Sequence, residues 1–275
     1  MQRVLGVDIG GTKIATGLVN AEAEVFSVRS VPTLAQDGYD TSIAQVWRAI
    51  EESLTDDVTA IGICAPGPLN PKTGVVLNPP NLPGWRTVAL RRLVEERFQL
   101  PVCVENDCNA AGLAEARFGA AKGSSNVFYA AIGTGIGSGI ILDGKIYHGK
   151  NGAAAEGGHV SIDYLSDIIC RCGSRGCIEA LASGHVLDRM GAYDLDEIAT
   201  QIGAWLGSVV SLLDPEIIVI GGGVSKIGEP LFEKLREIVP KRTVNPYAGD
   251  LPIVPAKFGA EAGIVGAAAV MMGGK

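Results

Sequence analysis

Three cysteines and one histidine are gathered in residues 159–177, where their side chains could bind a metal ion. Cys170, Cys172 and Cys177 follow His159 in the sequence. Thiolates and a neutral imidazole are typical ligands of tetrahedral Zn²⁺, and a site closed by four protein ligands is structural. Two other interpretations stay open: a disulfide, which needs an oxidising compartment and leaves one thiol unpaired, and cysteines that are simply free. Zinc would stabilise a loop with little apolar content, because metal binding contributes folding free energy.

Two carboxylates flank this cluster. Glu156 precedes His159, and Glu179 follows Cys177. A closed metal site would bring the two carboxylates together. Paired carboxylates accept hydrogen bonds from adjacent hydroxyl groups, so they suit a polyol. His159 could bind the metal with one ring nitrogen and the ligand with the other.

A glycine turn between two apolar runs occurs twice, in DIGGTKIATG at residues 8–17 and in IGTGIGSG at residues 132–139. Glycine lets backbone N–H groups approach an anion closely, whereas Asp8 would act on a phosphate through Mg²⁺ and its waters. We therefore expect a pair of phosphate-binding loops; the alternative is two ordinary hairpin turns. At Gly222, a nucleotide contact and a plain strand-to-helix turn both remain open. The expected phosphate-side residues are Asp8, Gly10, Gly11, Thr12, Lys13, Gly133, Thr134, Gly135 and Gly222.

Asp107 follows a buried-strand pattern in VENDCNAA, residues 104–111. Phosphoryl transfer to an alcohol needs a carboxylate near the hydroxyl group, to orient it and to accept its proton. The neighbouring Asn106 could hold an adjacent hydroxyl group. The alternative is structural, because Asp is also a favoured N-cap of a helix.

The elements that must position these residues repeat along the chain. Strand patterns at 3–9, 13–20 and 24–31 are followed by a helix, a strand and a helix, and the same βββαβα order restarts near residue 126. Residues 71–86 are expected to form an ordered loop, and helices are expected at about 179–190 and 195–213. An internal repeat of this length predicts two related α/β domains. Ligands of α/β proteins bind at strand ends and in clefts, so we expect the site in a cleft between the domains.

The composition limits the class of protein. The chain has 275 residues, of which 47% are hydrophobic and 19% charged, and its formal net charge is −7. These values are typical of a compact globular protein, and the acidic balance argues against a nucleic-acid partner. The start MQRVLGVDIG does not have the pattern of a signal peptide, and no apolar run is long enough to cross a membrane. We expect a cytoplasmic protein.

The motifs together resemble a known family. DIGGTK, APGP, ENDCNAA, GTGIGSG, EGGH, CRCGSRGCIEALASG and IVIGGG occur in this order over nearly the whole chain, and EGGH with C-x-C-G-x-x-G-C-x-E is a highly specific pair. They resemble bacterial sugar kinases of the ROK family, glucokinases most closely. The resemblance implies an α/β, actin-like ATPase fold, whose two ribonuclease-H-like domains close on ATP and a sugar. We expect a small domain of residues 1–108 plus about 261–275, and a large domain of residues 109–260 that carries the zinc loop.

The resemblance also implies a reaction, the transfer of phosphate from ATP to the 6-hydroxyl group of glucose with Mg²⁺, in a protein that binds structural Zn²⁺ and forms a homodimer. Asp107 would be the catalytic base. The sugar contacts would be Gly67, Asn81, Asn106, Asp107, Glu156, His159 and Glu179. The zinc ligands would be His159, Cys170, Cys172 and Cys177.

Two departures from the family pattern bear on function. Repressors of the family have a DNA-binding helical domain before the first strand, whereas this chain starts at that strand, so we do not expect a regulator. The helical segment near residues 185–203 is shorter than in family members, which bears on the adenine contacts. The rival hypotheses are a kinase for another hexose such as N-acetylmannosamine or mannose, a sugar-binding sensor without catalysis, and, more distantly, a zinc-ribbon nucleic-acid binder.

Overall fold

The computed structural model describes residues 3–184 and 194–273 and divides into two compact units. Unit 1 contains Met1–Phe118, His148–Ala154 and Ala260–Lys275, and unit 2 contains Gly119–Tyr147 and Ala155–Gly259. The chain thus passes from one unit to the other four times. The expected boundaries of the two repeated domains, at residues 108 and 261, stay a prediction.

Unit 1 is built on a five-stranded sheet of order β3-β2-β1-β4-β7. The three strands from the start of the chain pair antiparallel, and the other two run parallel to β1. The central strand β1 reads RVLGVDI and is mostly buried, as expected for a strand covered on both faces. The strands are β1 (Arg3–Ile9), β2 (Lys13–Val19), β3 (Val25–Pro32), β4 (Val58–Ala65) and β7 (Val102–Asn106).

Unit 2 contains a second five-stranded sheet, of order β10-β9-β8-β11-β12. Its strands pair in the same senses as their counterparts in unit 1, with β8 in the place of β1. The shared strand order is the three-dimensional form of the sequence repeat, and the predicted α/β architecture is confirmed. The strands are β8 (Val127–Ile132), β9 (Ile136–Leu142), β10 (Lys145–Ile146), β11 (Ile217–Gly221) and β12 (Ile253–Pro255).

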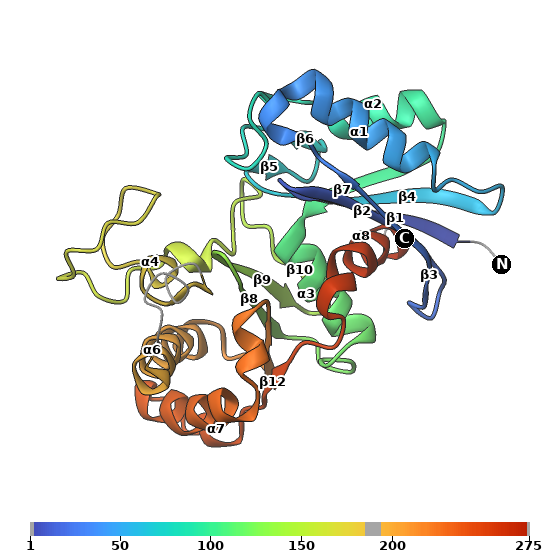
Figure 1. Ribbon diagram of the computed structural model, residues 1–275. Coiled ribbons are helices and arrows are strands. Elements are labelled where there is room, and N and C mark those ends of the chain that lie inside the picture. Colours follow the sequence, from blue (N-terminus) through green and yellow to red (C-terminus); the bar gives the residue numbers. More distant parts are fainter. Residues whose placement is uncertain (1–2, 185–193, 274–275) are drawn as a thin grey trace. The chain divides into compact units, whose positions relative to one another are not determined.

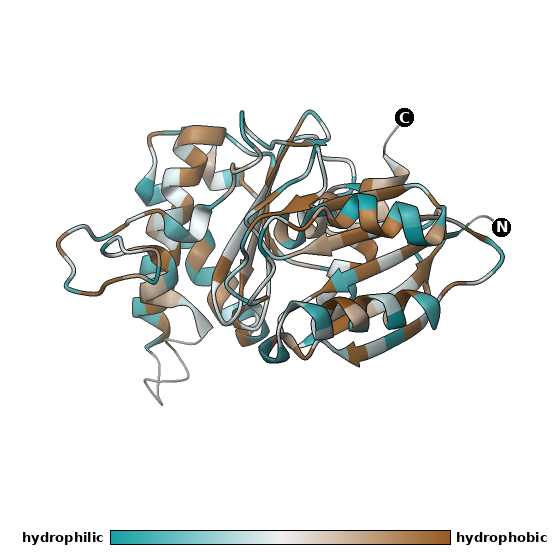
Figure 2. Ribbon diagram, turned by 90° about the horizontal axis from the view of Figure 1, so that it is seen from above, coloured by the Kyte–Doolittle hydropathy of each residue, from teal (hydrophilic) through white to brown (hydrophobic). Residues whose placement is uncertain are grey.

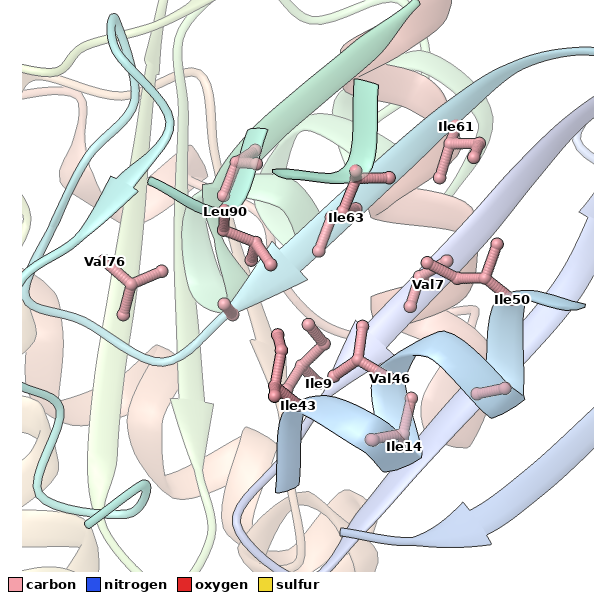
Figure 3. Packing of buried hydrophobic residues seen from close by; sticks show 14 of the residues in the cluster. Val7, Ile9, Ile14, Ile43, Val46, Ile50, Ile61, Ile63, Val76 and Leu90 are labelled. Carbon is pink, nitrogen blue, oxygen red and sulfur yellow. The ribbon is translucent and has the colours of Figure 1, made fainter. Parts of the chain in front are cut away.

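Helices α1 (Tyr39–Glu51) and α2 (Leu90–Phe98) belong to unit 1. In α1, Ile43, Val46 and Ile50 recur at a spacing of three and four residues, which places them on one face of a helix. This face packs against the side chains of β1, β2 and β4 in the apolar core (Figure 3). Burial of such side chains stabilises the sheet by roughly 1.5–3 kcal/mol each.

Helices α3 (Asp107–Phe118) and α8 (Ala262–Met272) also belong to unit 1 and pack against each other (Figure 1). The helix α8, coloured red, approaches the sheet closely because glycines face it. A Cβ atom at Gly62 would lie 1.9 Å from the backbone oxygen of Ala267, and Gly6 is approached in a similar way. The C-terminal end of the chain therefore completes the unit that the N-terminal end begins.

The helices of unit 2 are α4 (Ile178–Ala182), α6 (Leu195–Leu213) and α7 (Glu229–Ile238). The bounds of α6 match the helix predicted over 195–213. Its N-cap, Asp194, accepts hydrogen bonds from the backbone N–H groups of residues 196 and 197. Trp205 of α6 is fully buried in the second apolar core. Figure 2 shows that helices in both units carry polar as well as apolar residues.

Two regions differ from the predicted elements or lie outside the structure's description. Residues 71–86, predicted to be a loop, contain the short strand β6 (Val75–Val76), which pairs with β5 (Leu69–Asn70). The helix expected over 179–190 is described only up to residue 184, and residues 185–193 of the segment expected to be short are not described. Within the described ranges, no helix is both long enough and apolar enough to span a bilayer.

Candidate functional site

The junction between β7 and α3 carries the predicted base. Asn106 Oδ1 accepts hydrogen bonds from the backbone N–H groups of Cys108 at 3.0 Å and Asn109 at 3.2 Å. These are the second and third residues of α3, so Asn106 is the N-cap of this helix. Asp107 Oδ1 accepts a hydrogen bond from the N–H group of Cys108 at 2.8 Å. The capping role that offered a structural explanation of Asp107 is therefore filled by Asn106.

The first glycine turn joins β1 to β2. The N–H group of Gly10 donates to the oxygen of Lys13 at 2.9 Å, which closes the turn. The buried Thr33 holds it from the side: its hydroxyl group donates to the oxygen of Gly10 at 2.6 Å, and its N–H group donates to the oxygen of Thr12 at 3.0 Å. Thr12 and Lys13 are exposed, so the hydroxyl and ammonium groups expected to meet phosphate face solvent. The sequence did not point to Thr33.

Gly11 and Asn81 come together in unit 1. A Cβ atom at Gly11 would lie 2.8 Å from the backbone oxygen of Asn81, so only glycine fits without a shift. The loop that carries Asn81 is anchored by the fully buried Leu82. A predicted phosphate contact and a predicted sugar contact are thus neighbours. Gly67, another predicted sugar contact, lies after β4 in a turn with a cis Gly67–Pro68 peptide bond.

Asp8 is a half-buried carboxylate on β1. Its Oδ1 atom accepts a hydrogen bond from the thiol of Cys64 at 3.3 Å. Burial raises the pKa of Asp8, while the Cys64 hydrogen bond and the charge of Lys13 act in the opposite direction. Gly263, at the start of α8, makes room for this carboxylate, because a Cβ atom there would lie 2.3 Å from Asp8 Oδ2. One carboxylate beside the first glycine turn would fit Mg²⁺ if that turn binds phosphate as predicted, because Mg²⁺ takes its other ligands from phosphates and waters.

The second glycine turn joins β8 to β9 in unit 2. Its Gly133 donates an N–H hydrogen bond to the oxygen of Gly135 at 2.9 Å and accepts one from Gly184 at 2.6 Å. Gly222 has a φ angle of +84°, and a Cβ atom there would lie 2.4 Å from the oxygen of Ile132. Gly222 therefore packs directly on the strand end that precedes the turn, and both its backbone conformation and this contact require glycine.

Glu179 of α4 contacts the same turn. Its Oε2 atom accepts a hydrogen bond from the N–H group of Ile136 at 2.9 Å, and a Cβ atom at Gly135 would lie 2.6 Å from it. Thr134, between the two glycines, is exposed. One oxygen of Glu179 thus holds the turn, a role that the sequence did not suggest. The other oxygen makes no hydrogen bond to a described residue.

Glu156 directly precedes the short 3₁₀ helix Gly157–His159, and His159 is the last residue of this helix. Both side chains are exposed. The glycines of EGGH let this helix lie on β9, since a Cβ atom at Gly158 would be 1.9 Å from the oxygen of Ile136. The same helix packs against α4. The elements that carry Glu156 and Glu179 are therefore neighbours in unit 2.

The three cysteines and the histidine that were predicted to bind zinc come together. Cys170 Sγ lies 3.6 Å from His159 Nδ1, and Cys172 Sγ lies 3.7 Å from Cys177 Sγ. The four potential ligand atoms all lie within 4.8 Å of one another. A tetrahedral site with Zn–S bonds of about 2.3 Å has S–S edges of about 3.8 Å, so this spacing fits zinc. The cysteines are free rather than disulfide-bonded.

The thiols of this cluster do not ionise alike in the absence of a metal. Burial raises the pKa of Cys177 to about 12, and the neighbouring thiols of Cys172 and Cys170 act in the same direction. A hydrogen bond from the backbone at Ser174 lowers the pKa of Cys172. Thiolates that lie this close need a cation between them, because like charges disfavour each other's ionisation.

A buried carboxylate beside Asn106 was not singled out from the sequence. The side chain of Glu105 is 3% exposed, and its Oε2 atom lies 2.7 Å from Nε2 of His148. Glu105 is the first residue of ENDCNAA, and His148 lies in a glycine-containing loop. The sequence gives no local signal that they pair, because 43 positions separate them.

The twin sheets, their glycine turns and the Cys/His loop define the class of protein. A model of the ROK family matches residues 4–198 and 188–273, and the chain belongs to this family. The two matched parts overlap over 188–198, within the segment expected to be short. A glucokinase of Streptomyces coelicolor is 33% identical, over 98% of this chain and 97% of its own.

Two solved structures extend the comparison to the fold. A ROK hexokinase from Thermus thermophilus is 34% identical with a TM-score of 0.85, and covers 98% of this chain and 97% of its own. A ROK glucokinase from Streptomyces griseus, solved with glucose and AMPPNP, is 34% identical with a TM-score of 0.82 and covers 98% of both chains. The expected actin-like ATPase fold is confirmed. Kinases and repressors named for other sugars are also among the matches.

Proposed function

We propose that this ROK-family protein transfers the γ-phosphoryl group of ATP to the 6-hydroxyl group of glucose. The enzyme class, an ATP-dependent sugar kinase, follows from the family and from end-to-end similarity to a glucokinase and a hexokinase. The choice of glucose rests on the name glucokinase, which relatives from two Streptomyces species carry, and on the glucose in the Streptomyces griseus structure. The observation that carries the kinase proposal is the repeated strand–glycine turn–strand unit, which occupies the same place in both sheets.

In this proposal the base is Asp107. Its carboxylate accepts the proton of the sugar 6-hydroxyl group while that oxygen attacks the γ-phosphorus, and the bond to the β-phosphate oxygen breaks. The products are a sugar 6-phosphate and ADP. Asn106 supports the role because its Oδ1 atom caps α3, which leaves its Nδ2 group to donate to a neighbouring sugar hydroxyl group.

The glycine turns and Asp8 supply the phosphate side. The exposed side chains of Thr12, Lys13 and Thr134 can donate to phosphate oxygens. Mg²⁺, when bound, would neutralise phosphate charge, and Asp8 is the carboxylate that would hold it through its waters. Gly222 shapes the strand end behind the second turn, which supports a place near the nucleotide.

The zinc loop supplies the sugar side in unit 2. With Zn²⁺ on the three thiols and His159 Nδ1, the His159 Nε2 atom is left for a sugar hydroxyl group. Glu156 and the second oxygen of Glu179 would accept hydrogen bonds from adjacent hydroxyls. Metal analysis of the reduced protein should find about one zinc per chain. Cys172→Ser should lower zinc content and sugar affinity, whereas Cys103→Ser, outside the cluster, should change neither.

A coupled assay of ADP release tests the function. Glucose, mannose and N-acetylmannosamine are each offered with ATP and Mg²⁺, and the product is identified by its phosphorus resonance. Glucose should give the highest kcat/KM, with phosphate on the 6-oxygen. A higher kcat/KM with another sugar would establish the rival hypothesis, a kinase for another hexose. The observation behind this rival is that one matching structure is named a putative N-acetylmannosamine kinase. Nucleotide binding without ADP release with any hexose would instead indicate a sensor. The homodimer and the cytoplasmic location stay predictions.

A further inference from the structure

The side chain of Glu105 binds three groups around the turn that carries Asp107. Its Oε1 atom accepts hydrogen bonds from the N–H group of Asn106 at 2.9 Å and from Nδ2 of Asn109 at 3.1 Å. Its Oε2 atom pairs with His148 Nε2 at 2.7 Å. A carboxylate that is 3% exposed costs free energy unless both oxygens have partners, and these bonds supply them. Glu105 therefore links the end of β7, the first turn of α3 and a distant loop.

That loop is the segment His148–Ala154, which we call the strap. It belongs to unit 1, whereas the residues before and after it belong to unit 2. Two contacts give it a fixed form: the N–H group of Ala154 donates to the oxygen of His148 at 3.2 Å, and Gly152 packs against Pro71. Among the described residues, one side-chain hydrogen bond joins the strap to the rest of unit 1, and it is the bond between His148 and Glu105.

We propose that Glu105 and His148 form a positioning pair for phosphoryl transfer. The pair holds the strap against the turn of Asn106 and Asp107, and through the bonds of Glu105 to Asn106 and Asn109 it adds to the capping bonds of that turn. Neither residue takes the proton of the sugar; they act through Asp107 and its neighbour. This inference rests on the proposed kinase function.

The geometry explains why this pair matters for rate. Asp107 has a backbone bond at its own carboxylate, but the turn beneath it is held by Asn106 and Asn109, and both are bound by Glu105. Displacing a base by about 1 Å can cost on the order of 10²-fold in rate. Losing the strap should therefore lower the turnover more than the binding of ATP.

Steady-state kinetics of four variants test the pair. His148→Ala should lower kcat/KM for the sugar by roughly ten-fold or more, with the KM for ATP unchanged within about two-fold. His148→Gln, whose amide can donate from nearly the same place as Nε2, should recover most of the loss. Asn151→Ala, an exposed strap residue without a side-chain hydrogen bond among the described residues, is the matched control. In Glu105→Gln combined with His148→Ala, the loss should not exceed that of His148→Ala alone, because residues that act as a pair are not additive.

Hydrogen exchange tests the same pair without activity. In His148→Ala, amides of both the strap and residues 105–109 should exchange faster, while those of unit 2 core strands stay unchanged. Normal kinetics and normal exchange in residues 105–109 would overturn the inference. Wild-type protein that phosphorylates no sugar would instead overturn the proposed function, and the exchange measurement would still decide whether the pair holds the turn.

Discussion

At the scale of single residues, Asn106 rather than Asp107 caps α3, so the proposed role of Asp107 as the base can be tested without loss of the cap. Asp107→Ala leaves the N-cap of α3 in place, so the free energy of unfolding should change by no more than about 1 kcal/mol, the size of a first-turn charge effect. Because general-base catalysis contributes about 10²–10⁴-fold, kcat should fall by that factor while the Kd for the sugar changes little. Turnover and calorimetric sugar binding check this. Near-normal turnover would remove Asp107 from the role.

Asn106 combines two functions that substitution can separate. Asn106→Asp keeps an oxygen that caps α3 but loses the Nδ2 donor, so stability should be kept and the KM for the sugar should rise by several-fold. Asn106→Ala loses both, and the free energy of unfolding should fall by about 1 kcal/mol in addition. Chemical denaturation and kinetics of the two variants give the comparison. Equal stability of both variants would contradict the capping bonds at Cys108 and Asn109.

At the scale of elements, the loop that carries the Cys/His cluster should respond to pH in opposite ways with and without metal. Its contribution to stability without metal should fall as the pH rises, whereas its binding of zinc should weaken as the pH falls. Without metal, the raised pKa of Cys177 means that the folded state holds this proton more tightly than the unfolded chain. That contribution to stability is fully present below the unfolded pKa and is lost as the pH rises from about 9 toward about 12. With zinc bound, the thiol is already deprotonated, so zinc binding releases protons and weakens on acidification.

Two measurements check this pair of expectations. Zinc release followed with a chromophoric chelator should increase as the pH falls. The thermal midpoint of metal-free protein should decrease above pH 9 more steeply than that of metal-free Cys177→Ser, which serves as the control for other titrating groups. Identical slopes for the two proteins would show that Cys177 does not contribute.

At the scale of the whole molecule, the fold depends on the packing of helix α8, near the C-terminal end, against β1 and β4 from the N-terminal part of the chain. Helix α8 lies so close to β4 that a Cβ atom at Gly62 would meet the backbone of Ala267. Gly62→Ala should therefore lower the free energy of unfolding by about 1–3 kcal/mol, the range for overpacking, and more if α8 detaches. Gly249→Ala, where a Cβ atom meets nothing within 4 Å, is the control. A Gly62→Ala protein as stable as the control would show that α8 can shift without cost.

Much of this organisation was predictable because its signals are local. The turns at Gly10 and Gly133, the strands around them and the helix 195–213 follow from glycine placement and apolar periodicity over a few residues. The loop over 71–86 was harder, since its short strand pairing and buried Leu82 depend on neighbours elsewhere in the chain.

The sequence by itself determined the repeated architecture, the family and the set of polar side chains available for chemistry, because each of these follows from residue types and the short spacings between them. Only the tertiary structure decided that Asn106 caps α3, that one oxygen of Glu179 holds the second glycine turn, and that Glu105 binds His148. These are hydrogen bonds whose partner depends on distance and burial after folding. Residue types alone permit several partners, and packing selects one of them.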